Sequence, residues 1–535
     1  MSSHESSSPP QNPQPSPPSP PPRQVKNILF LHLDLGIGGA EQLILQLALA
    51  SKSLGHNVQI LTTRCDAHHC FAAVKPPDGT LHKAVQVKGR WIPASILGQW
   101  CTALCSHLRV IYLALWLVYS SYFQDNTPPP DLIVLDVLPT PLWILRHFSK
   151  ASLLFYCHFP DKLLTRNNPL LVEENEEGNA PPRRTTATKN KSLYRRLMDS
   201  MEDACMPLAD SILVNSKFTQ QVVLQEFSSL QPESLQVLYP SLDTSDDSKA
   251  TSDTDNHTDD ANQRVTLVSL NRYERKKKIE LILYAYALMR KDLSNKESNL
   301  QVIIAGGYDT QCVENVEYRG ELEQIAFTEL QLPKSEVQFL TSISDAQRQS
   351  LLKEARCVVY TPPKEHFGIV PLEVMYAGTP VVACNSGGPL ETVVDGVTGF
   401  LCDPTPQSFA KALQVLVGQP ELAHKMGAAG RQHVMDNFGT HVLQQEWQRL
   451  TQQAYERGQE RLQSSSSTSQ STSTSQSRSQ SSFPTRLFVY LEEAALAIFI
   501  CLLLTVALRQ VGFLEPEESI LGSMRRRFQT TGDEL

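Results

Sequence analysis

Short apolar runs recur along the chain and alternate with segments of helical period. The first run covers residues 27–33 and is followed by a glycine-rich turn, a helix-period segment at 40–54 and a second apolar run at 58–62. Uninterrupted runs of this length are typical of strands buried on both faces of a parallel sheet, and their alternation with helices indicates βαβ units. Similar runs predict further strands of this sheet at residues 132–135, 152–156 and 211–214.

A second series of apolar runs follows a break in the pattern. Residues 243–263 are rich in Asp, Ser and Thr and nearly free of large apolar side chains, so we expect an unstructured insertion there. Two doubly wound halves in one chain place a cleft between the carboxyl ends of their sheets, and the predicted fold class is α/β with two Rossmann-like domains. The strands expected in the second half lie at residues 265–270, 300–305, 337–340, 357–360 and 380–383.

Stretches of biased composition divide the chain further. Residues 172–190 are acidic and then Pro/Arg-rich, which predicts a surface insertion, and residues 464–482 are almost wholly Ser, Thr and Gln, which predicts a flexible linker. The predicted segments are 1–23 (disordered Pro/Ser tail), 24–240 (N-terminal domain), 241–263 (disordered acidic insertion), 264–462 (C-terminal domain), 463–484 (Ser-rich linker), 485–514 (membrane segment) and 515–535 (tail).

Two apolar segments are candidates for membrane contact. Residues 487–508 are apolar apart from Glu492 and Glu493, but the uncharged part is shorter than the ~20 residues that a comfortable span needs. We interpret this segment as a tail anchor, with a buried or interfacial helix as the alternative. Residues 110–123 are too short to span and are either core or an interfacial helix.

Charge and cysteine content exclude some classes of protein. The 535 residues carry a formal net charge of −8, which gives no footprint for nucleic-acid binding. The eleven cysteines are scattered without a CxxC pair, so buried free thiols are favoured over a zinc site. The Pro/Ser-rich start has no apolar core of a secretory signal, which favours a reduced, cytosolic location for the folded part.

A Gly-Gly turn follows the first predicted strand. Its third fingerprint position is Glu41 rather than Gly or Ala, and no acidic residue ends the second strand, so dinucleotide binding is disfavoured. Gly38 and Gly39 at a helix N-terminus still offer backbone N–H groups to an anion or to sugar hydroxyls. The alternative is a plain tight turn.

The strongest local pattern is a pair of glutamates separated by seven residues, Glu365 and Glu373. We expect Glu365 in the loop before a helix and Glu373 in the first turns of that helix. A carboxylate can accept hydrogen bonds from two sugar hydroxyls, which suits Glu373 to a ribose and Glu365 to a transferred sugar. Gly368, with Ile369 and Val370, would let the backbone approach such a ligand closely. The alternative is two solvated glutamates.

Basic and imidazole side chains follow two other strands. Arg272 and Lys277 lie in a cationic cluster after the strand at 265–270, where fixed cations would stabilise a leaving diphosphate. His158 follows the strand at 152–156 and is expected to point into the cleft from the opposite side. A solvated basic turn and a structural histidine are the alternatives.

Together these residues resemble the retaining glycosyltransferase family 4, over about residues 26–450. The resemblance rests on the Gly38-Gly39 loop, His158 in Tyr-Cys-His-Phe-Pro-Asp, the Arg272 and Lys277 pair, and Glu365 with Glu373. It is closest to members that mannosylate lipid-linked oligosaccharides for protein N-glycosylation.

The resemblance implies a GT-B enzyme that retains anomeric configuration, with an acceptor-side N-terminal domain and a nucleotide-sugar-binding C-terminal domain. GDP-mannose would be the donor. Mannosyl-chitobiosyl-diphosphodolichol would be the acceptor, receiving α1,3- and then α1,6-linked mannose. We expect no cofactor or metal, catalytic domains on the cytosolic face of the endoplasmic reticulum membrane, and association with other early mannosyltransferases of the pathway.

Three rival functions remain open from the residues alone. They are another family 4 transferase with a different donor or lipid, a GT-B sugar-nucleotide epimerase, and a non-catalytic nucleotide-sugar-binding scaffold. The apolar tail disfavours the epimerase, and the intact charged residues disfavour the scaffold.

Overall fold

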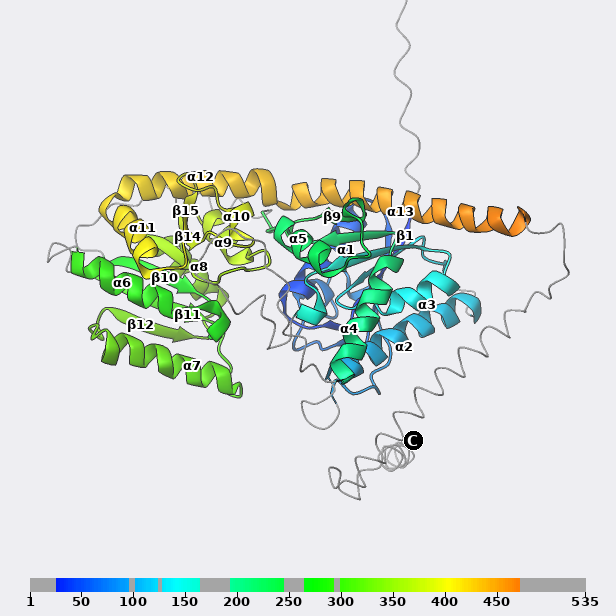
Figure 1. The fold of residues 1–535 in the computed structure, drawn as a ribbon, viewed down its shortest axis with the longest axis horizontal. Coiled ribbons are helices and arrows are strands. Elements are labelled where there is room, and N and C mark those ends of the chain that lie inside the picture. The colour runs from blue at the N-terminus through cyan, green and yellow to red at the C-terminus, as the bar shows by residue number, and fades with distance from the viewer. Residues whose placement is uncertain are drawn as a thin grey trace, which may run out of the picture. The chain divides into compact units, whose positions relative to one another are not determined.

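The computed structural model describes residues 26–95, 102–123, 128–163, 193–244, 264–292 and 299–471. Within these residues the chain forms two large parallel sheets with helices on both faces (Figure 1), which confirms the predicted fold class. A seven-stranded sheet occupies the N-terminal half, in the order β5-β3-β1-β6-β7-β8-β9. A six-stranded sheet occupies the C-terminal half, in the order β12-β11-β10-β13-β14-β15.

The N-terminal half contains every strand predicted for it, together with two short edge strands, β5 and β9, that the apolar pattern did not predict. A separate two-stranded sheet, Asp34–Leu35 (β2) with Arg64–Cys65 (β4), lies beyond the ends of β1 and β3. The strands of the main sheet are Asn27–Leu31 (β1), Asn57–Thr62 (β3), Val85–Val87 (β5), Leu132–Asp136 (β6), Ser152–Cys157 (β7), Ser211–Val214 (β8) and Leu235–Val237 (β9). The helices are Gly39–Ser53 (α1), Thr102–Phe123 (α2), Pro141–Phe148 (α3), Leu193–Cys205 (α4) and Lys217–Glu226 (α5).

The C-terminal half likewise contains its predicted strands, with β15 added at one edge. Its strands are Val265–Leu270 (β10), Leu300–Gly306 (β11), Val337–Thr341 (β12), Cys357–Tyr360 (β13), Val381–Cys384 (β14) and Gly399–Cys402 (β15). Its helices are Glu280–Asp292 (α6), Val313–Gln324 (α7), Asp345–Glu354 (α8), Ile369–Tyr376 (α9), Pro389–Thr392 (α10), Pro406–Gly418 (α11) and Pro420–Phe438 (α12).

Each sheet reverses its winding direction at one position, and ligands of open α/β sheets bind beyond the carboxyl ends of the strands at such a switch point. In the N-terminal sheet the switch lies between β1 and β6, which pair in parallel from Ile28 with Leu132 onward. In the C-terminal sheet it lies between β10 and β13. Both positions precede residues that the sequence singled out.

The last described helix, Thr440–Ser471 (α13), returns to the N-terminal half (Figure 1). Trp447 is fully buried, stacks with Phe30 of β1, and donates a hydrogen bond of 2.8 Å to Ser51 of α1. This differs from the predicted boundary, which placed residues 264–462 in one C-terminal domain. The helical period of α13 is the same whichever sheet it covers, so the pattern alone does not assign it. The helix also continues to Ser471, into the predicted linker.

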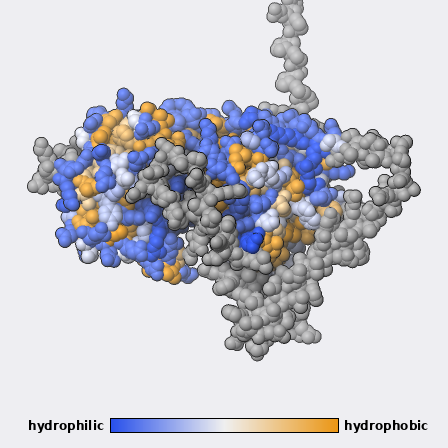
Figure 2. Space-filling model, in the orientation of Figure 1, coloured by the Kyte–Doolittle hydropathy of each residue, from blue (hydrophilic) through white to orange (hydrophobic). Residues whose placement is uncertain are grey.

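Helix α2 begins eight residues before the apolar segment predicted at 110–123, so the expectation of a segment too short to span does not hold for the whole helix. Among the described residues, Thr102–Tyr122 is the one helical stretch long and apolar enough to cross a membrane, by length and composition. One face packs in the core through Leu113, Ala114 and Leu117, as one of the two predicted alternatives requires. The opposite face is exposed, and Figure 2 shows a hydrophobic patch on the surface where Figure 1 places α2.

Several predicted segments lie outside the described residues. They are the tail at 1–23, the insertion at 172–190, most of the insertion at 241–263, most of the linker at 463–484, and the apolar segment at 487–508 with the tail after it.

Candidate active site

The C-terminal half brings Lys277 and Glu365 together, although the sequence separates them by three strands. The Lys277 ammonium lies 2.5 Å from Glu365 Oε2. Burial alone would raise the pKa of Glu365, but the Lys277 charge, together with a hydrogen bond from Tyr360, holds that pKa below its ordinary value. The carboxylate is therefore ionised and anchored, while its position in the loop after β13 leaves it partly exposed. Tyr360 was not predicted from the sequence.

Two glycines shape the end of β11 beside the predicted cation Arg272. A Cβ on Gly306 would lie 1.8 Å from the Asn271 carbonyl oxygen, and one on Gly307 would contact the Arg272 side chain at 3.4 Å. Glycine at 306 therefore lets the segment after β10 pass close to β11. Arg272 is exposed, and no hydrogen bond or ion pair from it is found among the described residues. Its guanidinium is available to an anionic ligand.

Glu373 lies on α9 and forms an ion pair with Arg348 of α8. Burial raises the pKa of Glu373 above its ordinary value, and the Arg348 charge opposes that rise. The two predicted glutamates therefore differ, because one is paired to a lysine in a loop and the other to an arginine on a neighbouring helix. Arg348 was missed because nothing in its surrounding sequence distinguishes it from a solvated helix residue.

Gly368 caps the N-terminus of α9 in the left-handed region, with φ +79°. A Cβ there would also contact the Tyr360 ring at 3.3 Å, so only glycine fits without strain. The first N–H groups of α9, at Ile369 and Val370, have no partner within the helix and point out of its N-terminus. The segment thus has the form of an anion-binding helix end.

Gly38 and Gly39 are not explained by backbone strain. Gly38 precedes α1 with φ −166°, an extended conformation open to any residue, and neither glycine has a positive φ. A Cβ on Gly38 would meet the Glu41 carboxylate, whereas one on Gly39 would have nothing within 4 Å. The space beside Gly39 is open, as a ligand-facing turn requires.

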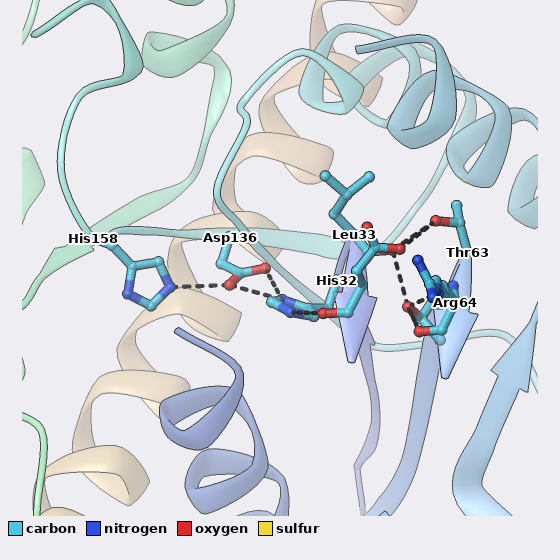
Figure 3. A network of polar contacts seen from close by, with 8 residues as sticks. His32, Leu33, Thr63, Arg64, Asp136 and His158 are labelled. Atoms are coloured by element: carbon cyan, nitrogen blue, oxygen red, sulfur yellow. Dashed lines mark hydrogen bonds and ion pairs between the residues drawn. The ribbon is translucent and has the colours of Figure 1, made fainter. Parts of the chain in front are cut away.

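His158 joins a buried chain of polar contacts in the N-terminal half (Figure 3). Its Nε2 lies 3.0 Å from Asp136 Oδ2 at the end of β6, and Asp136 Oδ1 lies 2.8 Å from His32 Nδ1 at the end of β1. His32 and Asp136 are buried, and His158 is 22% exposed in its side chain. His158 is therefore the solvent-accessible member of this series of hydrogen bonds.

The partners of His32 determine its charge. Nδ1 faces the Asp136 carboxylate and Nε2 lies 2.9 Å from the Asp34 carbonyl oxygen, and both partners can only accept hydrogen bonds. Both ring nitrogens therefore donate, and His32 is an imidazolium. Burial would lower the pKa of His32, but the Asp136 carboxylate, assisted by Glu41, raises it above the ordinary value.

Asp136 is correspondingly held ionised. Burial would raise its pKa, but the His32 charge and the hydrogen bonds from both histidines keep it below the ordinary value. His158 Nε2 donates to this carboxylate, which selects the tautomer with the proton on Nε2 and Nδ1 as the acceptor. The sequence singled out His158, but it gave no signal for Asp136 and His32, which are 104 residues apart.

The loops of the two halves also meet directly. The rings of Phe159 and His366 stack at 3.6 Å between centroids, and burial lowers the pKa of His366 to about 4, which keeps that ring neutral. Glu391 accepts hydrogen bonds of 2.8 Å from the backbone N–H groups of Lys217 and Phe218, at the start of α5. Glu391 therefore binds a helix N-terminus of the other half.

Comparison with known families agrees with this arrangement. Residues 37–246 match the family described as Glycosyltransferase Family 4, and residues 253–433 match the one described as Glycosyl transferases group 1. Sucrose-phosphate synthase from Thermosynechococcus elongatus is similar in structure, with a TM-score of 0.56 and 20% identity, over 80% of this chain and 99% of that chain. Anabaena Alr3699/HepE in complex with UDP and glucose has a TM-score of 0.53 and 19% identity, with the same coverage.

The fold and the family matches define a GT-B glycosyltransferase. Alpha-1,3/1,6-mannosyltransferase ALG2 of Homo sapiens is 39% identical over 416 residues, which cover 77% of this chain and 92% of that protein. The Dictyostelium discoideum protein of the same name is 39% identical over 431 residues, covering 77% and 94%. The chain belongs to the alpha-1,3/1,6-mannosyltransferase family and is an enzyme.

Proposed function

We propose that this enzyme transfers mannose from GDP-mannose to mannosyl-chitobiosyl-diphosphodolichol, first in α1,3 and then in α1,6 linkage. Membership of the mannosyltransferase family supports the sugar and the linkages. The ion pair between Lys277 and Glu365, at the switch point of the C-terminal sheet, is the observation that carries the donor site.

The donor diphosphate binds to Arg272, Lys277 and the N–H groups of Ile369 and Val370. Negative charge grows on the diphosphate as the bond from the anomeric carbon to the phosphate oxygen breaks, so fixed cations and a helix N-terminus stabilise the transition state more than the ground state. The acceptor hydroxyl forms the new bond on the same face of the sugar, and its proton passes to the departing phosphate oxygen. No side-chain base is required in this scheme.

The two glutamates bind different parts of the donor. Glu365, held ionised by Lys277, accepts hydrogen bonds from hydroxyls of the mannose. Glu373 accepts from the ribose hydroxyls, with Arg348 fixing its orientation. Gly368 lets the α9 terminus approach the nucleotide, and Gly38 with Gly39 forms the opposite wall.

His158 contributes a hydrogen-bond acceptor from the acceptor-side half. Asp136 fixes the proton on Nε2, so Nδ1 is free to accept from a hydroxyl of the transferred sugar. Asp136 and His32 do not touch substrate in this scheme and act as positioning residues.

The reaction needs no cofactor and no metal ion, because arginine and lysine supply the positive charge. The catalytic halves face the cytosol, where nucleotide sugars are made, and the enzyme works at the endoplasmic reticulum membrane, in the company of other early mannosyltransferases of the same pathway.

A donor competition assay tests this proposal. Purified enzyme in detergent is given a mannosyl-chitobiosyl diphospholipid with GDP-mannose, GDP-glucose or UDP-glucose, in EDTA and then with added Mg²⁺. We expect transfer from GDP-mannose in both conditions. Preference for another donor would replace the assignment of mannose, and loss of transfer in EDTA would contradict the metal-free mechanism.

A further inference from the structure

A second concave site lies on the N-terminal sheet, away from His158. It is a cavity of about 680 Å³ at the carboxyl ends of β3 and β5. Three arginines and one histidine line it, namely Arg64, Arg90, Arg109 and His82. Asp66 is the acidic side chain of the lining, so the balance of charge is positive.

Arg109 shows that this cavity has an unfilled hydrogen-bonding position. The residue is only 4% exposed, and its guanidinium forms an ion pair with Asp34. Its Nε–H has no hydrogen-bond partner in the part of the chain that the structure describes. A buried donor without a partner is costly, and an anionic ligand in the cavity would supply the missing acceptor.

The other two arginines are accessible. Arg64 and Arg90 are exposed, and neither forms an ion pair among the described residues. Arg90 lies in a turn fixed by α2, because Gly89 has φ +78° and a Cβ there would overlap the Tyr112 ring at 2.7 Å. The next residue, Trp91, contacts that same ring edge-on and is 62% exposed.

Helix α2 places this cationic cavity beside an apolar surface. The helix that contributes Arg109 also exposes a stripe of apolar side chains, which recur at intervals of seven, four and three residues. An exposed apolar stripe of this kind is typical of a surface that meets lipid. The stripe consists of Leu108, Leu115, Tyr119 and Tyr122.

Spacing separates the cavity from the reacting sugar. In the order β3-β1-β6-β7, the strands that precede Arg64 and His158 in the chain, β3 and β7, are three positions apart, roughly 14 Å at the usual strand separation. The donor diphosphate already has its cations in the other half. An acceptor whose diphosphate is separated from its reactive hydroxyl by a short oligosaccharide matches a second anion site at this distance.

We propose that this cavity binds the diphosphate of the lipid-linked acceptor, with Arg64, Arg90 and Arg109 as ligands and the α2 stripe next to the lipid. This inference rests on the proposed function, since it assigns a part of the acceptor to a place on the enzyme. Arginine suits the task because its planar guanidinium donates two parallel hydrogen bonds to a phosphate.

Binding of a short polyprenyl diphosphate tests the inference. Full-length enzyme in detergent is titrated with geranylgeranyl diphosphate, geranylgeraniol and GDP-mannose, in the wild type, in Arg64→Gln combined with Arg90→Gln, and in Arg196→Gln. Arg196 is an exposed arginine on α4 and serves as the matched control. We expect the double variant to weaken geranylgeranyl diphosphate binding about 10-fold or more, as loss of charge-assisted hydrogen bonds predicts. Binding of geranylgeraniol and GDP-mannose should stay unchanged.

Three results of the binding titrations would overturn the inference. They are undiminished diphosphate binding in the double variant, an equal loss in Arg196→Gln, and a parallel loss of GDP-mannose binding, which would place the cavity in the donor site. Mannose transfer by the same proteins separates this inference from the proposed function. Absence of transfer in the wild type would contradict the function itself, whereas normal transfer with an unchanged acceptor KM in the double variant would contradict the cavity assignment alone.

Discussion

Lys277 and Glu365 lie 88 residues apart in the sequence, yet their charged groups are 2.5 Å apart. Lys277 ends the turn after β10 and Glu365 lies in the loop after β13, and these two strands are neighbours at the switch point of the C-terminal sheet. In this pair, Lys277 is the cation expected to bind the diphosphate, and Glu365 is the carboxylate expected to bind the sugar. Binding of the donor at one member therefore changes the environment of the other.

Removing the cations should slow turnover without unfolding the protein. We expect Lys277→Ala and Arg272→Ala each to lower kcat by ~100-fold or more, because each removes charge stabilisation at the leaving diphosphate. Arg272 is exposed, so Arg272→Ala should change the thermal midpoint little. The Lys277 side chain is only 16% exposed and neutralises Glu365, so Lys277→Ala should lower the midpoint, and its kcat is measured well below that midpoint. Either variant keeping near-normal kcat would show that the diphosphate binds elsewhere.

The two glutamates should give unequal effects. Glu373→Gln is expected mainly to weaken nucleotide affinity, with Arg348→Ala reproducing that loss because Arg348 orients the carboxylate. Glu365→Gln should lower kcat as well, since this carboxylate contacts the mannose. Separate measurements of GDP and GDP-mannose binding distinguish the two glutamates, because Glu373 is expected to contact the nucleotide and Glu365 the mannose. Small and equal effects on both ligands would support two solvated glutamates.

Asp136→Asn should separate positioning from catalysis. The amide leaves the buried His32 imidazolium without its counter-charge, which is expected to cost about 3 kcal/mol or more of folding stability. The amide also no longer selects which ring nitrogen of His158 carries the proton. The pH profile of kcat should therefore shift in folded enzyme assayed at low temperature. A variant with normal stability and an unchanged pH profile would contradict the charge assignment.

The stability difference between wild type and Asp136→Asn should depend on pH in a defined sense. The folded pKa of His32 is raised, so its contribution is complete below the ordinary value of 6.5 and is lost as pH rises through the folded pKa. The folded pKa of Asp136 is lowered, so its contribution is complete above the ordinary value of 3.8 and is lost at lower pH. The difference in unfolding free energy between wild type and Asp136→Asn should therefore be largest between pH 3.8 and pH 6.5. It should become smaller at alkaline pH. A difference that grows with alkaline pH would contradict an imidazolium.

Helix α13 should be necessary for the N-terminal half. Trp447→Ala removes a fully buried ring from the core of β1 and α1, and a loss of ~3–5 kcal/mol is expected in chemical denaturation. Truncation after Gln463, by comparison, should leave GDP-mannose binding intact and weaken membrane association. Equal stability of Trp447→Ala and wild type would show that α13 is dispensable.

The orientation at the membrane can be tested through two sequons, Asn190-Lys-Ser and Asn256-His-Thr. If the catalytic halves face the cytosol, neither asparagine meets the lumenal glycosylation machinery. Treatment of the protein from cells with peptide N-glycosidase should leave its mobility on a gel unchanged. A shift that disappears in Asn190→Gln or Asn256→Gln would place these segments in the lumen.

The apolar runs predicted the two sheets because strands buried on both faces, such as β6 and β7, carry Asp or Ser only at an end and so leave the apolar run unbroken. Short edge strands such as β5 and β9 carry too few residues for the same signal. Local motifs indicated Glu373 and His158. Arg348, which pairs with Glu373, and Asp136 with His32, which continue the contacts of His158, come from distant strands and helices and have no motif of their own. The helical pattern of α13 does not specify which of the two sheets it covers, because that is decided by tertiary packing alone.

The central claim concerns the transferred sugar and its acceptor. The most direct measurement is mass spectrometry of a mannosyl-chitobiosyl diphospholipid after incubation with GDP-mannose and the purified enzyme, followed by linkage-specific mannosidases. Successive addition of two hexoses, the first removed by an α1,3-specific and the second by an α1,6-specific mannosidase, and lost in Lys277→Ala, is the predicted result. Transfer of a different sugar, transfer in other linkages, or no transfer by folded enzyme that binds GDP-mannose would contradict the proposed function.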